Sequence, residues 1–145
     1  MKRLLLTGYF LFLLLPATSQ EWQTDLTTAQ KLASVHDLPI VLVFQGSDWC
    51  APCIKLDREI WSTDKFKAYA RQHFVMLKAD FPKKKANALT VEQQEKNNAL
   101  AEKYNQNGYF PYVVVMNKDG EVLGTTSYKK MDPTEYISLL ESFKS

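Results

Sequence analysis

Apolar and polar positions alternate along the chain in blocks whose periods predict helices and strands in turn. Short, largely apolar runs are typical of strands buried on both faces, and they occur at residues 40–44, 74–79 and 111–116. Segments with helical spacing of apolar positions flank these runs, at about residues 27–36, 50–60, 64–72, 91–104 and 134–143. A turn signal at 117–120 joins the third run to a partner strand at 121–126. This order predicts an α/β fold in which a central mixed β-sheet has helices on both faces.

The N-terminus has the pattern of a secretory signal peptide. Lys2 and Arg3 precede an apolar stretch over residues 4–15, and the small residues that follow offer a cleavage site. The apolar stretch is shorter than the ~20 residues that span a bilayer, so stable membrane insertion after cleavage is not expected. The chain therefore divides into a signal peptide at 1–19 and one domain at 20–145, and we expect a periplasmic or secreted mature protein.

Cleavage of the signal peptide changes the charge of the chain. The full sequence has 18 Lys and Arg against 16 Asp and Glu, a formal net charge of +2. Lys2 and Arg3 leave with the signal peptide, so the mature domain is formally neutral and its charge does not favour nucleic-acid binding. The run Lys83-Lys84-Lys85 is interpreted as a solvated loop.

Candidate chemistry is concentrated in Trp49-Cys50-Ala51-Pro52-Cys53, which holds both cysteines of the chain and follows the first buried run. A strand leading into C-x-x-C at a helix start is typical of a dithiol redox site. At a helix N-terminus, Cys50 is expected to have a lowered thiol pKa, because unpaired backbone amides and the helix dipole stabilise the thiolate. Cys53, one turn later, is placed to attack a mixed disulfide formed on Cys50 and to release the product.

Two other uses of a cysteine pair fit this sequence less well. A structural zinc site needs four ligands, whereas two cysteines supply two, and neither His36 nor His73 stands at zinc-finger spacing. A purely structural disulfide would close a loop so small that it gains little from restricting the unfolded chain. We therefore expect no metal and no cofactor, because the cysteines themselves supply the chemistry.

Over roughly residues 22–145, the chain resembles the thioredoxin superfamily. The resemblance rests on Trp49-Cys50-Ala51-Pro52-Cys53 after a buried strand, on Phe110-Pro111 opening a later strand, and on the hairpin and helix that end the chain. Gly46 to Cys50, followed by Lys55 to Glu59, is similar to exported bacterial thioredoxin-like proteins and to the C-terminal redox domain of the inner-membrane disulfide reductase. The resemblance implies a thioredoxin-like fold and thiol:disulfide oxidoreductase activity.

The resemblance also implies roles for individual residues. Cys50 would be the exposed nucleophile and Cys53 the buried resolving thiol. Trp49 would shield the site, or would serve as a plain aromatic wedge between strand and helix. Pro111 would be in the cis form and would place the Phe110 backbone where an incoming peptide pairs with it. An ordinary trans proline at a strand start is the alternative.

Two places depart from the thioredoxin pattern. Thioredoxins carry a buried aspartate six residues before the first cysteine, where it helps to deprotonate the resolving thiol, and this chain has Phe44 there. Asp57 is the candidate substitute, because it stands four residues after Cys53 and such residues share a helix face. A solvated surface carboxylate is the alternative. The segment Gly108-Tyr109-Phe110-Pro111 is one residue longer than the usual Gly-x-Pro, so its aromatics form either a lip for a protein substrate or part of the core.

The dipeptide between the cysteines favours a reductant. Ala51-Pro52 resembles the Gly-Pro of thioredoxins, and it contains no histidine that would stabilise the Cys50 thiolate as in strong oxidants. We expect protein disulfides as substrates and an upstream membrane thiol reductant as the electron donor. Two alternatives stay open. One is a dedicated reductant or metallochaperone in copper-protein or cytochrome c maturation, which would need a further metal ligand; the other is a non-enzymatic peptide-binding module.

Overall fold

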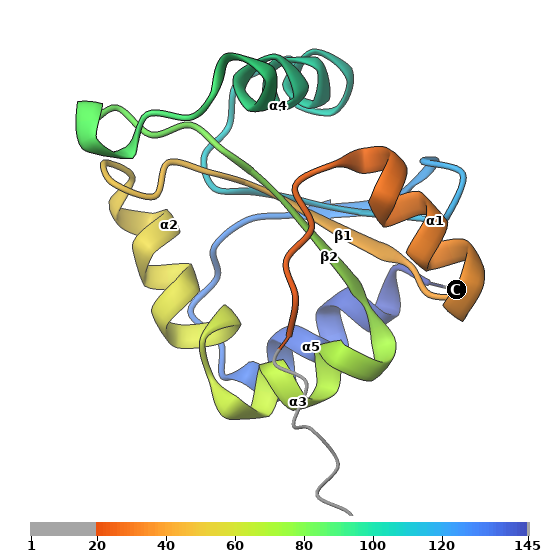
Figure 1. Cartoon of the computed structure of the whole chain (residues 1–145). Helices are drawn as coiled ribbons and strands as arrows, with labels where there is room; N and C mark the ends of the chain where they lie inside the picture. The colour runs from red at the N-terminus through yellow and green to blue at the C-terminus, as the bar shows by residue number, and fades with distance from the viewer. Residues whose placement is uncertain (1–19, 145) are drawn as a thin grey trace, which may run out of the picture.

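The structure is a computed structural model that describes residues 20–144, so the predicted signal peptide lies outside the described residues. A four-stranded sheet runs through the middle of the domain in the order β2-β1-β3-β4 (Figure 1). Its strands are β1 (Ile40–Gln45), β2 (Val75–Asp80), β3 (Tyr112–Met116) and β4 (Val122–Thr126). β1 and β2 are parallel, whereas β3 is antiparallel to both of its neighbours. The predicted mixed sheet is confirmed.

Helices cover both faces of this sheet. They are α1 (Leu26–His36), α2 (Ala51–Leu56), α3 (Asp64–His73), α4 (Val91–Tyr104) and α5 (Pro133–Ser142), with a short 3₁₀ turn η2 (Lys85–Asn87). α1 and α4 lie on one side of the sheet, and α3 and α5 lie on the other (Figure 1). α2 begins where β1 ends, at one edge of the domain, so the cysteine motif lies at the end of a central strand.

The side chains of β1 alternate between two apolar cores. Val41 and Val43 point into the core beneath α3 and α5, whereas Ile40, Leu42 and Phe44 point into the core beneath α1 and α4. Because both faces of a central strand are covered, every position of the run 40–44 must be apolar, which explains its unbroken hydrophobic pattern. This double burial fixes the strand that carries the cysteine motif at its end.

The sequence pattern predicted one continuous helix over residues 50–60, but the helix that follows the motif is interrupted. α2 ends at Leu56, and a π-helical turn η1 (Asp57–Trp61) follows, with the Ser62 amide bonded to the Asp57 carbonyl at 2.8 Å. The wider turn brings the consecutive residues Ile60 and Trp61 both into the core, where they are at most 2% exposed. Trp61 then packs edge-on against aromatic rings of α3 and α5, and this packing accounts for the interrupted helix.

Candidate active site

The cysteine pair lies in the first turn of α2, directly after the loop that leaves β1. Cys50 is the N-cap of α2, and its Sγ accepts a hydrogen bond of 3.3 Å from the Cys53 amide. Pro52 stands in the first turn, where the amide that proline lacks would have no helical partner. The two cysteines form a disulfide with their Cα atoms 5.2 Å apart. Such an amide hydrogen bond would favour a thiolate at Cys50 after reduction, as the sequence predicted.

The predicted difference in exposure between the two cysteines is wrong for this oxidised form. Cys50 and Cys53 are each 4% exposed. The disulfide and the amide hydrogen bond hold the Cys50 sulfur against the first turn of α2, so it is as covered as its partner. The predicted exposure of the Cys50 sulfur therefore concerns only the reduced protein, in which this disulfide is broken.

Trp49 stands beside the pair and is fixed from several sides. Its Nε1 donates a 2.7 Å hydrogen bond to the carbonyl of Phe81, and its ring meets Phe110 edge-on at 5.5 Å between centroids. The Lys83 ammonium lies 3.9 Å from the centre of the indole. The indole also leaves no space for a side chain at Gly46. Trp49 is nevertheless 39% exposed, so its outer face forms part of the site surface.

The Phe110–Pro111 peptide bond is cis, as the resemblance implied. Pro111 is buried and its carbonyl accepts a 2.6 Å hydrogen bond from Ser127 Oγ. Phe110 lies between the rings of Trp49 and Phe81, each 5.5 Å away between centroids. Phe110 therefore belongs to the aromatic wall of the site and not to an open lip.

Asn105 holds the segment that leads to this proline, a role that the sequence analysis missed. Its side chain is 4% exposed and bonds both polar groups of the Tyr109 backbone, accepting from the amide and donating to the carbonyl, each at 2.9 Å. Tyr109 is left 56% exposed. Of the two aromatics in the longer approach, Tyr109 is thus the one that faces solvent, and its role as a lip for a protein substrate stays a prediction.

The lysine run is not a free loop, although it is exposed as predicted. Asp48 accepts hydrogen bonds from the amides of Lys83 and Lys84, each at 2.9 Å, and from Asn87 Nδ2 at 3.0 Å. These bonds, led by the one from the Lys83 amide, lower the pKa of the Asp48 carboxyl. Asp80 makes a second link, since it accepts from the Ser47 amide at 2.9 Å and from Ser47 Oγ at 2.6 Å. Two aspartates therefore fasten residues 80–87 to the loop before Cys50.

Asp57 and Cys53 line the same small cavity, of about 200 Å³, together with Gln45, Ser47 and Ile54. Asp57 is an exposed residue whose carboxylate accepts a 3.0 Å hydrogen bond from Ser62 Oγ. The strand position that carries the buried acid in thioredoxins is occupied by Phe44, which is fully buried in the core beneath α1 and α4. The structure thus brings Asp57 and Cys53 to one cavity, while the role of Asp57 stays a prediction.

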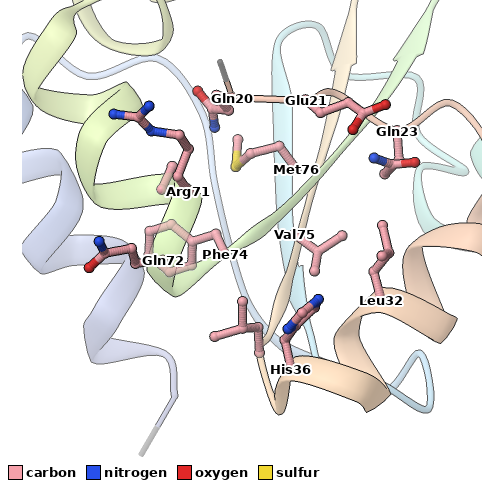
Figure 2. Close-up of a pocket in the computed structure, with 12 residues that line it drawn as sticks. Gln20, Glu21, Gln23, Leu32, His36, Arg71, Gln72, Phe74, Val75 and Met76 are labelled. Carbon is pink, nitrogen blue, oxygen red and sulfur yellow. The ribbon is translucent and has the colours of Figure 1, made fainter. Parts of the chain in front are cut away.

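A larger hollow of the described residues is remote from the cysteines. It has a volume of about 660 Å³ and lies along the outer side of β2, between α1 and α3 (Figure 2). Its lining includes Leu32, His36, Phe74 and Met76, and no residue of the cysteine motif.

Within residues 20–144, no three His, Cys, Asp or Glu side chains are grouped to hold a metal. In the same residues no helix has the length and apolar character that a bilayer crossing requires.

A redox-active cysteine pair at the start of α2 and a cis proline directly before the neighbouring strand β3 define a thiol–disulfide oxidoreductase of the thioredoxin class. The thioredoxin-like domain family matches residues 26–144, and the chain belongs to that family.

Relatives of known structure or activity agree with this class. The chain is 32% identical over 126 residues to the disulfide bond reductase DsbH of Chlamydia pneumoniae, covering 87% of this chain and 74% of that protein. A solved structure of a DsbH oxidoreductase superposes with a TM-score of 0.79 at 31% identity, covering 94% of each chain. The C-terminal domain of DsbD from Neisseria meningitidis, in its oxidised form, shares the fold with a TM-score of 0.53. Its identity is 23%, with 80% of this chain and 90% of that chain covered.

Proposed function

We propose that this protein is an exported reductant of protein disulfides, which draws its electrons from a thiol reductant in the membrane. The observation that carries the proposal is the Cys50–Cys53 disulfide at the start of α2, together with the cis Phe110–Pro111 bond, whose Phe110 ring contacts Trp49 beside Cys50. The similarity to a protein named as a disulfide bond reductase supports the direction of electron flow. The absence of a histidine between the cysteines supports the same direction, because the Cys50 thiolate lacks that source of stabilisation.

The first step joins enzyme and substrate through sulfur. The reduced protein presents the Cys50 thiolate, which attacks one sulfur of a substrate disulfide. A Cys50–substrate bond forms, the substrate's own S–S bond breaks, and the other substrate sulfur leaves as a thiolate that takes a proton. The backbone of Phe110, fixed by the Tyr109–Asn105 hydrogen bonds, is the edge at which the substrate chain would pair during this attack.

The second step releases the product and re-forms the disulfide of the structure. Cys53 loses its proton and its thiolate attacks the Cys50 sulfur, so that the Cys50–Cys53 bond forms and the substrate leaves as its second thiol. Two electrons have then passed from the protein to the substrate. The cavity shared by Cys53 and Asp57 offers a route for the proton, either directly or through one water molecule. A membrane thiol reductant would restore the dithiol by the same exchange.

Insulin reduction tests the proposal. We expect the protein to accelerate the precipitation of the insulin B chain by dithiothreitol, because its dithiol passes electrons to the interchain disulfides of insulin. Cys50→Ser is the test variant, and Ser34→Ala, at an exposed position of α1, is the matched control for handling and folding. Equal rates for the unaltered protein and Cys50→Ser would exclude the reductant and would favour the peptide-binding alternative.

Export is tested separately from activity. Lys2, Arg3 and the apolar stretch that follows support cleavage after residue 19. We expect protein recovered from the cell envelope to begin at Gln20, as measured by intact mass. A full-length mass in the cytosol would contradict the export and leave the redox proposal standing.

A further inference from the structure

Residues 83–85, named here the basic loop, lie beside the site and not at a distance from it. Lys83 is in contact with Trp49, and Trp49 is in contact with Phe110, which adjoins the cis proline. A continuous line of contacts therefore runs from Phe110 across the Trp49 ring to the basic loop. A polypeptide that pairs with the Phe110 backbone has these residues within reach.

The position of the basic loop is fixed by the fold. The Asp48 carboxylate holds the amides of Lys83 and Lys84 at 2.9 Å, and Asp80 holds Ser47, so the loop and the approach to Cys50 form one unit. Asp48 is two residues from Cys50. Connecting β2 to α4 does not by itself require a loop that is attached to the segment between β1 and Cys50.

The ammonium groups of Lys84 and Lys85 are available to a partner, whereas that of Lys83 lies over the Trp49 ring. Lys83, Lys84 and Lys85 are exposed, and none of them is in an ion pair with a carboxylate of residues 20–144. The two carboxylates that contact the loop, Asp48 and Asp80, are directed at backbone amides and at the Ser47 and Asn87 side chains. The mature domain is formally neutral, but three adjacent lysines against the carboxylates of Asp48 and Asp80 leave this surface beside Trp49 with a net positive charge.

We propose that the basic loop selects substrates, by docking an acidic segment that flanks the target cysteine of a disulfide-bonded protein. This inference rests on the proposed function and names its substrate class. Lys84 and Lys85 would face the carboxylates of the segment, while the exposed face of Trp49 packs against its backbone or apolar side chains. Attraction between such charges acts mostly on the association rate and is screened by salt.

The test compares two short peptides that carry the same internal disulfide, one flanked by Glu-Glu and the other by Gln-Gln. The second-order rate constant for oxidation of the reduced protein is measured for each by thiol alkylation and mass spectrometry. At about 10 mM ionic strength we expect the acidic peptide to react about three- to tenfold faster, the effect of two exposed charge pairs. At about 1 M salt the two rates should converge, because charges are then screened within ~3 Å.

Two double variants locate the effect. Lys84→Gln/Lys85→Gln should bring the acidic-to-neutral ratio close to one, and Lys84→Glu/Lys85→Glu should bring it below one. The control Lys65→Gln/Lys118→Gln removes the same charge from α3 and from the β3–β4 turn, far from the site, and should keep the ratio of the unaltered protein.

The outcomes separate this inference from the proposed function. If neither peptide is reduced, the proposed function fails and the inference falls with it. If both peptides are reduced at equal rates, or if the control variant loses the ratio as fully as the loop variant, the inference alone is overturned. A ratio that depends on Lys84 and Lys85 and disappears at high salt supports it.

Discussion

Gly46→Ala tests whether the wall of the site depends on one fixed indole. A Cβ at position 46 would collide with the Trp49 ring, whose atoms are the three nearest to it. The ring cannot yield by a small shift, because Phe81, Phe110 and Lys83 hold it from other directions. We therefore expect the alanine methyl group to expel the indole from its place.

The cost follows from the contacts that Trp49 would lose. The hydrogen bond to the Phe81 carbonyl contributes about 0.5–1.5 kcal/mol, the edge contact with Phe110 about 0.5–1.5 kcal/mol, and the Lys83 cation about 0.5–1 kcal/mol. Trp49 is 39% exposed, which favours the lower part of each range. Against this, alanine restricts the unfolded chain and returns about 0.4–1 kcal/mol. We expect a net loss of about 1–2 kcal/mol in the free energy of unfolding.

Urea denaturation of the oxidised protein, followed by far-ultraviolet circular dichroism, measures the loss. The decisive comparison repeats Gly46→Ala in a Trp49→Ala background, as a double-mutant cycle. There the methyl group has no indole to displace, and Gly46 does not adopt a positive φ, so the substitution should be neutral or slightly stabilising. The same destabilisation in both backgrounds would refute the argument from the indole.

One measurement on the unaltered protein and two substitutions have definite expected results. Cys50 should show a thiol pKa below the free value of ~8.5, measured as the pH dependence of its alkylation by iodoacetamide in the reduced protein; faster reaction at Cys53 would reverse the assignment. Asp57→Asn should slow the release of a trapped Cys50 mixed disulfide and leave the first attack nearly unchanged, as stopped-flow measurement of the two steps can show; equal effects on both would remove Asp57 from the mechanism. Asp25 caps α1, and the hydrogen bond from the Thr28 amide lowers the pKa of the Asp25 carboxyl. The contribution of this carboxylate to the free energy of unfolding is therefore present above its unfolded-state pKa, and it is lost as the pH falls through the folded-state pKa. Asp25→Asn should therefore flatten the acid limb of a plot of urea midpoint against pH, and an unchanged limb would contradict this account.

Local patterns predicted the sheet, the helices and the cysteine pair because each of these depends on neighbouring residues. The unbroken run 40–44 reflects double burial, and Cys50 and Cys53 lie one helical turn apart whatever surrounds them. The cis form of Pro111 could be expected only from the resemblance, since cis bonds are about one in twenty of X–Pro bonds.

Features that depend on distant contacts were not predictable in this way. The attachment of residues 83–87 to Asp48 joins positions 35 or more apart, and no pattern within the lysine run predicts it. The π turn after α2 follows from packing of Trp61 against two other helices, which a periodicity within 50–60 does not contain. Asn105 looks like any polar residue at a helix end until its hydrogen bonds to Tyr109 are seen.

The reduction potential of the Cys50–Cys53 pair tests the central claim most directly. The protein is equilibrated in dithiothreitol buffers of graded ratio, quenched, alkylated, and the reduced fraction is read from the added mass. Without a histidine between the cysteines, the account predicts a value near that of thioredoxin, about −270 mV. A value near that of the strong oxidant DsbA, about −120 mV, would contradict it, because electrons would then flow from substrate thiols to the protein.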